Sequence, residues 1–175
     1  MRRLMLLRHA KSDWSVGGQR DHDRTLASRG REAAPLIGAY MAHHGLMPDK
    51  VLVSSARRAR ETWELVAPAF GKAPDVSYDD RLYEAGPKAL LNPIRDVAPA
   101  VHGLLVVGHN PGIQELAGLL MASGDIDARQ RLLEKFPTTA LAVIDFPIDS
   151  WSALRAHSGR LDRFVTPRAL DVDTD

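Results

Sequence analysis

The sequence predicts a single α/β domain with a mostly parallel central sheet flanked by helices and an antiparallel hairpin at the C-terminal edge of that sheet. Short apolar runs typical of strands alternate along the chain with segments whose apolar residues recur at helical spacing. The chain has 175 residues, of which 45% are hydrophobic and 26% charged, as in one globular domain. We place the domain at residues 1–165 and a tail at residues 166–175, whose acidic last five residues should fray.

Four runs rich in leucine or β-branched residues are expected to be strands: residues 4–7, 51–53, 104–107 and 141–146. Residues 151–157 alternate weakly between apolar and polar side chains. With residues 147–150 as a turn, they would form the second arm of the C-terminal hairpin.

Four helices are expected between these strands, because apolar residues recur three and four positions apart. Pro35 lies inside the first helix and should kink it or delay its start. Pro87 and Pro111 stand where a first helical position is expected, and Asn110 would cap the helix that follows it. The apolar faces comprise Ala33, Leu36, Ile37, Tyr40 and Met41; Ala59, Trp63 and Val66; Leu90, Ile94 and Val97; and Ile113, Leu116, Ala117 and Leu120.

Composition excludes several classes of protein. The formal net charge is +1, which favours neither nucleic acid nor an anionic membrane as a partner. The chain has no cysteine, which excludes disulfide scaffolds, thiolate zinc sites and cysteine-nucleophile enzymes. The apolar start ends at Arg8, too early for a signal peptide, and no apolar run approaches a membrane span. We expect a cytoplasmic monomer.

Three expected strands end in residues suited to phosphate chemistry. Residues 8–12, 54–58 and 108–112 follow these strands and would deliver two histidines and several arginines to one rim of the sheet. Arginine matches phosphate oxygens bidentately, and histidine can attack or protonate. Each segment alone would fit a structural histidine or a solvated arginine pair. Together they predict a phosphate site.

Two helix starts strengthen that prediction. Arg57 and Arg58 fall in the first turn of a helix that should begin near Ser55, where a cation opposes the helix dipole. An anion bound between the arginine side chain and the free N–H groups would remove the penalty. Residues 110–112 would form a second such pocket.

The motifs in these segments resemble those of the histidine phosphatase superfamily, which has the phosphoglycerate-mutase-like fold. Residues 6–12 read LLRHAKS, residues 53–62 read VSSARRARET and residues 107–111 read VGHNP. Residues 21–26, DHDRTL, are similar to the small branch of SixA-type phosphohistidine phosphatases. The likeness runs from residue 4 to about residue 146. Ala27 and Ser54–Ser55 depart from the usual Thr and Ser-Pro, and we expect these departures to affect helix capping rather than the phosphate pocket.

The resemblance implies a catalytic set and no cofactor or metal. His9 would attack phosphorus as a neutral imidazole, and water would then hydrolyse the phosphohistidine. Arg8 and Arg58 would lower the pKa of His9 and bind the phosphoryl oxygens. His109 would be the third cationic donor once phosphate is bound. Ser12 and Asn110 complete the expected substrate-binding residues.

The general acid is less clearly marked in the sequence. Glu84 best matches the carboxylate of larger family members, although a surface role fits it nearly as well, and Asp13, Asp21 and Asp23 are rivals. Residues 21–25 also match the Asp-x-Asp-x-Thr pattern of haloacid-dehalogenase phosphatases. That motif should directly follow a buried strand, whereas a loop precedes it here. His22 and Asp23 lack a second cluster with metal-ligand spacing.

The substrate remains open between a phosphorylated protein and a small phosphate ester. The loops around the inferred site are short, so the pocket should be open and should accept a protein-borne phosphoryl group, most plausibly phosphohistidine. Alternatives are a small-molecule phosphomonoesterase, a binding module without turnover, and a mutase. The retained Arg8, His9, Arg58 and His109 argue against the binding module, and the short segment before residue 104 argues against a mutase lid.

Overall fold

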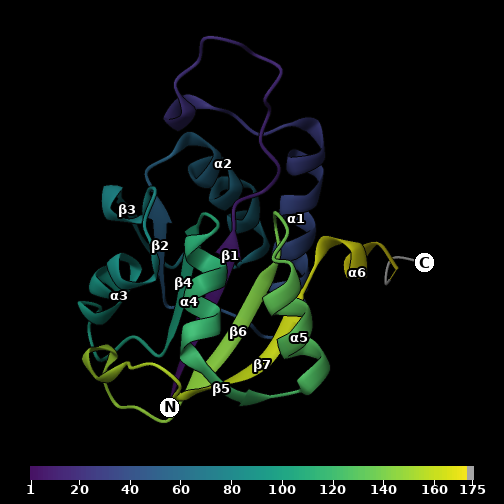
Figure 1. Cartoon of the computed structure of the whole chain (residues 1–175). Helices are drawn as coiled ribbons and strands as arrows, with labels where there is room; N and C mark the ends of the chain where they lie inside the picture. The colour runs from purple at the N-terminus through teal and green to yellow at the C-terminus, as the bar shows by residue number, and fades with distance from the viewer. Residues whose placement is uncertain (173–175) are drawn as a thin grey trace.

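A seven-stranded sheet organises the chain in the computed structural model, which describes residues 1–172 (Figure 1). The strand order is β3-β2-β4-β1-β6-β7-β5, with β6 antiparallel to both of its neighbours and the other pairs parallel. The predicted mostly parallel α/β domain with an antiparallel hairpin is therefore confirmed. The strands are β1 (Arg2–Arg8), β2 (Lys50–Ser54), β3 (Asp75–Asp79), β4 (Gly103–Gly108), β5 (Met121–Gly124), β6 (Leu141–Phe146) and β7 (Gly159–Val165).

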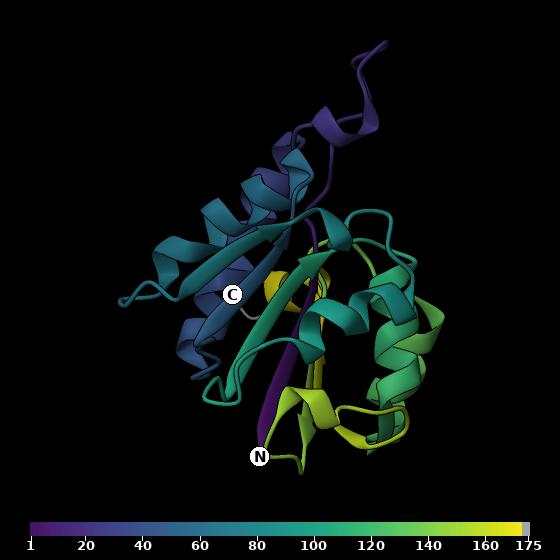
Figure 2. The same ribbon diagram turned by 90° about the vertical axis from the view of Figure 1, so that its left-hand side faces the viewer.

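The central strands are apolar on both faces because helices cover both sides of the sheet, as the edge-on view shows (Figure 2). In β1, Leu4 and Leu6 enter one hydrophobic core, while Met5 and Leu7 enter the other. This alternation follows from the two-residue period of a strand. Burial on both faces fixes the register of β1 and therefore the position of the residues that follow it.

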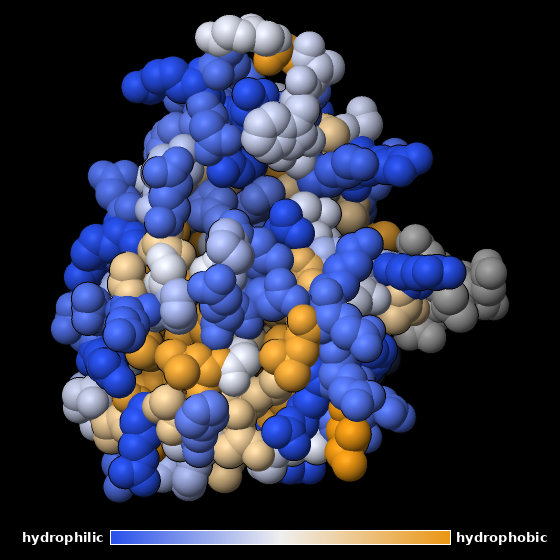
Figure 3. All heavy atoms as spheres, viewed as in Figure 1, coloured by the Kyte–Doolittle hydropathy of each residue, from blue (hydrophilic) through white to orange (hydrophobic). Residues whose placement is uncertain are grey.

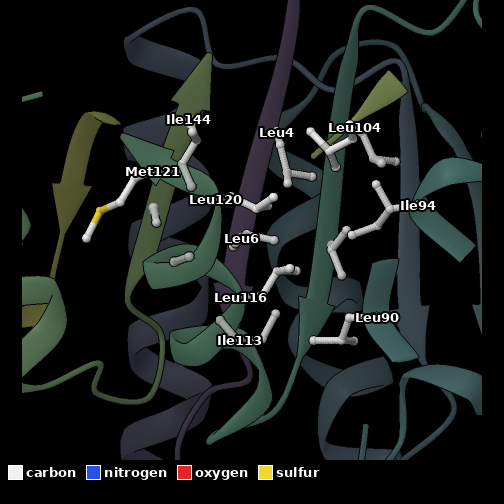
Figure 4. Close-up of a cluster of buried hydrophobic side chains, with 14 of the residues drawn as sticks. Leu4, Leu6, Leu90, Ile94, Leu104, Ile113, Leu116, Leu120, Met121 and Ile144 are labelled. Atoms are coloured by element: carbon white, nitrogen blue, oxygen red, sulfur yellow. The ribbon is translucent and has the colours of Figure 1, made fainter. Parts of the chain in front are cut away.

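Six helices divide between the two faces of the sheet. Residues of α1, α2 and α6 pack into one core, and residues of α3, α4 and α5 pack into the other, part of which Figure 4 shows. The helices are α1 (Ser28–His43), α2 (Arg57–Val66), α3 (Pro87–Arg95), α4 (Gly112–Leu120), α5 (Ile126–Glu134) and α6 (Pro167–Val172). None of the helices within residues 1–172 is long and apolar enough to cross a membrane.

The second arm of the C-terminal hairpin was predicted at the wrong residues. It is β7, Gly159–Val165, whereas Trp151–Ala153 forms a short 3₁₀ helix. Trp151 and Leu154 stand three positions apart and both enter the core, and the Trp151 Nε1–H donates to the Val101 carbonyl at 2.8 Å. Their spacing belongs to a 3₁₀ turn. The sequence prediction also missed β3, β5 and α5.

Three details of the helices differ from expectation. Helix α1 begins at Ser28 with Pro35 inside it, so this proline does not delay its start. Helix α4 begins at Gly112, and Pro111 occupies the N-cap position predicted for Asn110. The Asn110 Oδ1 still accepts from the Gln114 N–H at 3.3 Å. Helix α3 ends at Arg95, so Val97 lies beyond it although it joins the same core.

The predicted tail contains structure over part of its length. Helix α6 spans Pro167–Val172, and Leu170 packs in the core with α1. Of the end expected to fray, residues 173–175 lie outside the described residues.

The loop between β1 and α1 is pinched at its base. Ser12 forms an isolated antiparallel bridge with Leu26, and the Asp13 N–H donates to the Thr25 carbonyl at 2.9 Å. Gly30 in α1 lies against the same base, since a Cβ there would collide with the carbonyl oxygen of Lys11. The loop leaves this neck at the top of Figure 1, above the carboxyl ends of the parallel strands.

Candidate active site

The carboxyl ends of β2, β4 and β1 lie side by side and bring the predicted phosphate residues into one cavity. The cavity has a volume of about 530 Å³. Polar and charged residues cover most of the upper part of the molecule in the view of Figure 3, where the carboxyl ends of the parallel strands lie. The lining residues are Arg8, His9, Lys11, Ser12, Trp14, Asp21, Arg58, His109, Asn110, Lys135, Pro137 and Thr138.

His9 is held in a single tautomer at the end of β1. Its Nδ1 lies 2.7 Å from the Ala10 carbonyl oxygen, which can only accept, so Nδ1 carries the proton. Burial, with smaller contributions from Arg58 and Arg8, lowers the pKa of His9 to about 4. The ring is therefore neutral at pH 7, and its lone pair is on Nε2. The Arg58 Nε–H points to this atom at 3.4 Å.

The backbone around His9 is fixed from two sides. The His9 N–H donates to the Gly108 carbonyl at 2.9 Å, which ties the end of β1 to β4. The Ala10 N–H donates to Thr62 Oγ1 at 2.9 Å, and that hydroxyl donates to the Arg58 carbonyl at 2.7 Å. Thr62 thus couples the end of β1, next to His9, to the first turn of α2, which carries Arg58.

Arg58 is buried and oriented by Asp21. Its Nη1 donates to the Asp21 carbonyl at 2.8 Å, and its Nη2 donates to the Asp21 carboxylate at 3.0 Å. The Tyr83 hydroxyl donates to the same carboxylate oxygen at 2.5 Å. The hydrogen bond from Tyr83, followed by those from Arg58, lowers the pKa of Asp21. Burial and Asp21 raise the pKa of Tyr83 to about 12, so Tyr83 remains a donor.

His109 faces His9 across the cavity, with 5.1 Å between the ring centroids. Burial, followed by the proximity of His9, lowers its pKa to about 3. One ring nitrogen, Nε2, is 2.7 Å from the Ser54 hydroxyl, whereas Nδ1 has no hydrogen-bond partner within residues 1–172. Nδ1 is therefore a buried ring nitrogen of His109 whose hydrogen-bonding capacity is unused among the described residues.

Arg8 supplies the second guanidinium. Its Nη1 donates to the Phe136 carbonyl at 3.0 Å, while its buried Nε has no partner among the described residues. Burial and the proximity of Arg58 lower the pKa of Arg8, although an arginine stays charged at neutral pH. Asn110 donates to the same Phe136 carbonyl at 3.1 Å. The site thus places two arginine side chains beside a neutral imidazole.

The structure separates the predicted site residues into two groups. Arg8, His9, Ser12, Arg58, His109 and Asn110 all line the cavity. Glu84 does not; it is exposed, in a turn with φ 54°. Arg57, the neighbour of Arg58, is half exposed and lies 3.8 Å from Glu61.

Among the rival carboxylates, only Asp21 lines the cavity. Asp13 accepts from Ser15, and Asp23 pairs with Arg20. Asp21 stands in a short 3₁₀ helix, Asp21–Asp23, and not at the end of a buried strand. This placement agrees with treating the haloacid-dehalogenase match as chance.

Sequence reasoning missed four residues that shape the site: Ser54, Thr62, Tyr83 and Trp14. Ser54 was expected to affect helix capping alone, but its hydroxyl contacts His109 and also accepts from the Ala56 N–H at 3.3 Å. Tyr83 immediately precedes Glu84, yet nothing in the sequence indicates which of the two faces the site. Thr62 is marked in the sequence only by its fixed spacing from Arg58.

Comparison with known families agrees with this geometry. Residues 4–90 match the family model of the histidine phosphatase superfamily (branch 1). That range contains β1, β2 and α2, and with them Arg8, His9 and Arg58.

Similar proteins cover nearly the whole chain. An uncharacterized protein of Mycobacterium leprae is 39% identical over 166 residues, which are 93% of this chain and all of that protein. A crystal structure from Agrobacterium tumefaciens, provisionally assigned as the phosphohistidine phosphatase SixA, is 32% identical with a TM-score of 0.80 and covers 95% of this chain and 98% of its own. The mitochondrial serine/threonine-protein phosphatase PGAM5 of Mus musculus is 30% identical over 173 residues, 94% of this chain and 58% of PGAM5.

Proposed function

The chain belongs to the histidine phosphatase superfamily, and we propose that it is a metal-independent phosphatase that forms a phosphohistidine on His9. The observation that carries the proposal is the tautomer of His9. The bond from Nδ1 to the Ala10 carbonyl leaves a lone pair on Nε2, 3.4 Å from the Nε of a phosphate-binding arginine.

In the first step, the Nε2 lone pair attacks phosphorus as the bond to the leaving group breaks. The electron pair of that bond stays with the leaving atom, which takes up a proton. In the second step, water attacks phosphorus, the N–P bond breaks and its electron pair returns to Nε2. The water proton leaves through a base, and inorganic phosphate is released.

The charge that develops on the phosphoryl oxygens is met by groups already in place. Arg58 is oriented by Asp21 and Arg8 by the Phe136 carbonyl, so neither side chain needs to be ordered during the reaction. A bound dianion would raise the pKa of His109 and favour a proton on Nδ1, which has no partner in the free site.

Asp21 is the proton donor that the geometry favours over Glu84. It lines the cavity, and Arg58 bridges it to His9 through two of its nitrogens. Its pKa is lowered in the free protein, so the acid role requires that the negative charge of bound substrate raise this pKa until the carboxyl takes up a proton. After proton transfer, the carboxylate can act as the base for the attacking water.

For the substrate, we propose a phosphoryl group presented on a protein, with phosphohistidine first. The 32% identity to a structure provisionally assigned as SixA supports this choice. Phosphoserine is the second candidate, because the chain is 30% identical to PGAM5, a serine/threonine-protein phosphatase. Small phosphate esters remain the alternative for a cavity of this size.

The nucleophile is tested by His9→Ala with an exposed histidine, His44→Ala, as the matched control. Turnover of p-nitrophenyl phosphate should fall by several orders of magnitude in the first variant and stay unchanged in the second. Rapid quenching of the unmodified protein should trap an acid-labile, base-stable phosphoryl adduct at His9. Normal turnover by His9→Ala would exclude the mechanism.

The acid is tested by comparing Asp21→Asn with Glu84→Gln on two substrates. Asparagine keeps an acceptor for Arg58 and Tyr83 but cannot supply the proton. An acid role predicts a much larger loss on an alkyl phosphate than on p-nitrophenyl phosphate, whose leaving group needs little protonation. An equal loss on both substrates would reduce Asp21 to orienting Arg58, and a selective loss in Glu84→Gln would return the acid role to Glu84.

The substrate is tested by measuring kcat/KM on phosphohistidine proteins, phosphoserine and phosphotyrosine peptides, and sugar phosphates. The proposal expects a protein-borne group to be preferred. A sugar phosphate favoured by a hundredfold, or about 2.7 kcal/mol of transition-state preference, would identify a small-molecule phosphatase instead.

A further inference from the structure

Trp14 is an exposed tryptophan in the wall of the catalytic cavity. It stands in the loop between β1 and α1, and 66% of its surface is accessible to solvent. The other two tryptophans, Trp63 and Trp151, are 4% and 0% exposed. Tryptophan carries a large apolar surface, so exposure beside a polar site needs a reason. Trp14 lines the same cavity as His9 and Arg58.

The indole is held in place by side chains that belong to the site. The guanidinium carbon of Arg24 lies 4.0 Å from the ring centroid, a cation–π distance. The Arg24 side chain is only 16% exposed, and its Nε lies 3.7 Å from Asp21 Oδ1. Asp21 in turn binds Arg58. A chain of contacts through Arg24 and Asp21 therefore links Trp14 to Arg58.

Arg24 stacks on the indole, yet 66% of the Trp14 surface stays exposed, and Trp14 lines the cavity. A fixed aromatic surface close to a phosphate pocket suits a flat ring attached to the phosphoryl group. The cations of the site engage the phosphoryl group itself, so the ring next to them has no charge to satisfy and contributes by stacking.

We infer that Trp14 is a stacking subsite for a planar ring that carries the phosphoryl group, so that the preferred substrates have an aromatic or heteroaromatic leaving group. The inference rests on the proposed function and deepens it by naming the substrate class. The imidazole of a phosphohistidine is one such ring, and an aryl or heterocyclic small molecule is the other source.

Binding of non-hydrolysable phosphonates tests the subsite without turnover. Phenylphosphonate and methylphosphonate share the dianionic head, and cyclohexylphosphonate adds a ring of similar size that is not planar. By calorimetry, phenylphosphonate should bind about tenfold more tightly than methylphosphonate, which corresponds to about 1.4 kcal/mol. Cyclohexylphosphonate should show much less of this gain. Phenylphosphonate should also change the tryptophan fluorescence, because Trp14 is the exposed tryptophan.

The matched variant is Trp14→Leu, which keeps an apolar side chain and removes the aromatic ring. The ratio of the phenyl to the methyl affinity should fall to near one, while the methyl affinity reports whether the phosphate pocket is intact. A phenyl preference that survives this change, or a cyclohexyl affinity equal to the phenyl affinity, would overturn the subsite. Because no turnover is needed, these results do not depend on whether His9 is the nucleophile.

Turnover then separates the two sources of the ring. In Trp14→Leu, kcat/KM for a phosphohistidine peptide should fall about tenfold relative to that for a phosphoserine peptide. A fall confined to aryl phosphates would keep the subsite but assign it to small molecules, against the proposed protein substrate. If kcat/KM falls selectively for none of the ring-bearing substrates, the inference is refuted, while the phosphatase proposal is unaffected.

Discussion

The two buried histidines should make the fold sensitive to mild acid. In the folded protein, the pKa of His9 is about 4 and that of His109 about 3, both lowered mainly by burial. In the unfolded chain, each returns to its ordinary value of 6.5. Between these values the unfolded state binds more protons than the folded state, so the free energy of unfolding falls as pH falls below 6.5.

The size of the loss follows from these values. At pH 5, both rings are still neutral in the folded protein and mostly protonated in the unfolded chain. Acidification from pH 7 to pH 5 therefore costs about 2 kcal/mol for each ring, or about 4 kcal/mol for both. The result depends little on the folded values as long as they lie below 5. Relative to a total stability of about 5–15 kcal/mol, this is a large share.

The assay is urea unfolding at pH 7 and pH 5 of the wild type, His9→Gln, His109→Gln and the double variant. Phosphate-free buffer is needed, since phosphate would stabilise the folded state. Each single variant should lose about 2 kcal/mol less on acidification than the wild type, and the double variant about 4 kcal/mol less. Asp21 does not interfere, because its lowered pKa matters only as pH falls through its usual value of 3.8.

Equal losses in the wild type and in His9→Gln would refute the reasoning. The imidazole would then be protonated as readily in the folded protein as in the unfolded chain, and the mechanism would lose its neutral nucleophile. A smaller loss in the His9 variant alone would point to an error at His109 and leave the nucleophile intact.

Three other changes have defined outcomes. Dialysis against a chelator should leave activity intact, since the side chains of Arg8 and Arg58 supply positive charge to the site. A loss of activity that Mg²⁺ restores would contradict this. Arg58→Lys keeps the positive charge but cannot reproduce the hydrogen bonds to His9 and Asp21. The value of kcat/KM for p-nitrophenyl phosphate should therefore fall about 10²–10³-fold. A loss under tenfold would show that the geometry of the guanidinium group matters little. Gly30→Ala should lower the free energy of unfolding by about 1–3 kcal/mol, because the new Cβ would collide with the Lys11 carbonyl oxygen. The control Gly17→Ala adds a Cβ in open space and should change the free energy of unfolding little. Equal stability of the two variants would contradict the packing of Gly30 against Lys11.

Apolar patterns predicted the central part of the fold because helices cover both of its faces. The strand at Leu141–Phe146 has the predicted bounds, since its first four residues form a continuous buried apolar run that shows in the sequence. Strand β5, Met121–Gly124, has four residues, only the first of them buried, so no apolar run marks it. The hairpin arm was predicted at residues 151–157 because a buried 3₁₀ turn such as Trp151–Ala153 and a buried strand can show similar short patterns of apolar residues.

In the site, residues on strand ends were predictable and residues that act across the chain were not. Arg8 ends a buried strand, His9 and His109 follow buried strands, and the topology gathers the ends of such strands. The sequence could not rank Asp21 above Asp13 and Asp23 as the general acid, because only the contacts of Asp21 with Arg58 and Tyr83 distinguish it. Trp14 and Ser54 act on the site through contacts that no local pattern records.

The pinched base of the loop after β1 separates variation within the loop from the register of the sheet that positions His9. The bridge between Ser12 and Leu26 closes the loop on itself, so a change in its length or sequence does not pass into the register of the sheet. Doubling the length of such a loop costs only about 0.6 kcal/mol in closure entropy. Transplanting residues 14–20 between relatives, with Asp21 kept, should therefore change the ratio of kcat/KM values between substrates while Arg8, His9 and His109 stay where they are.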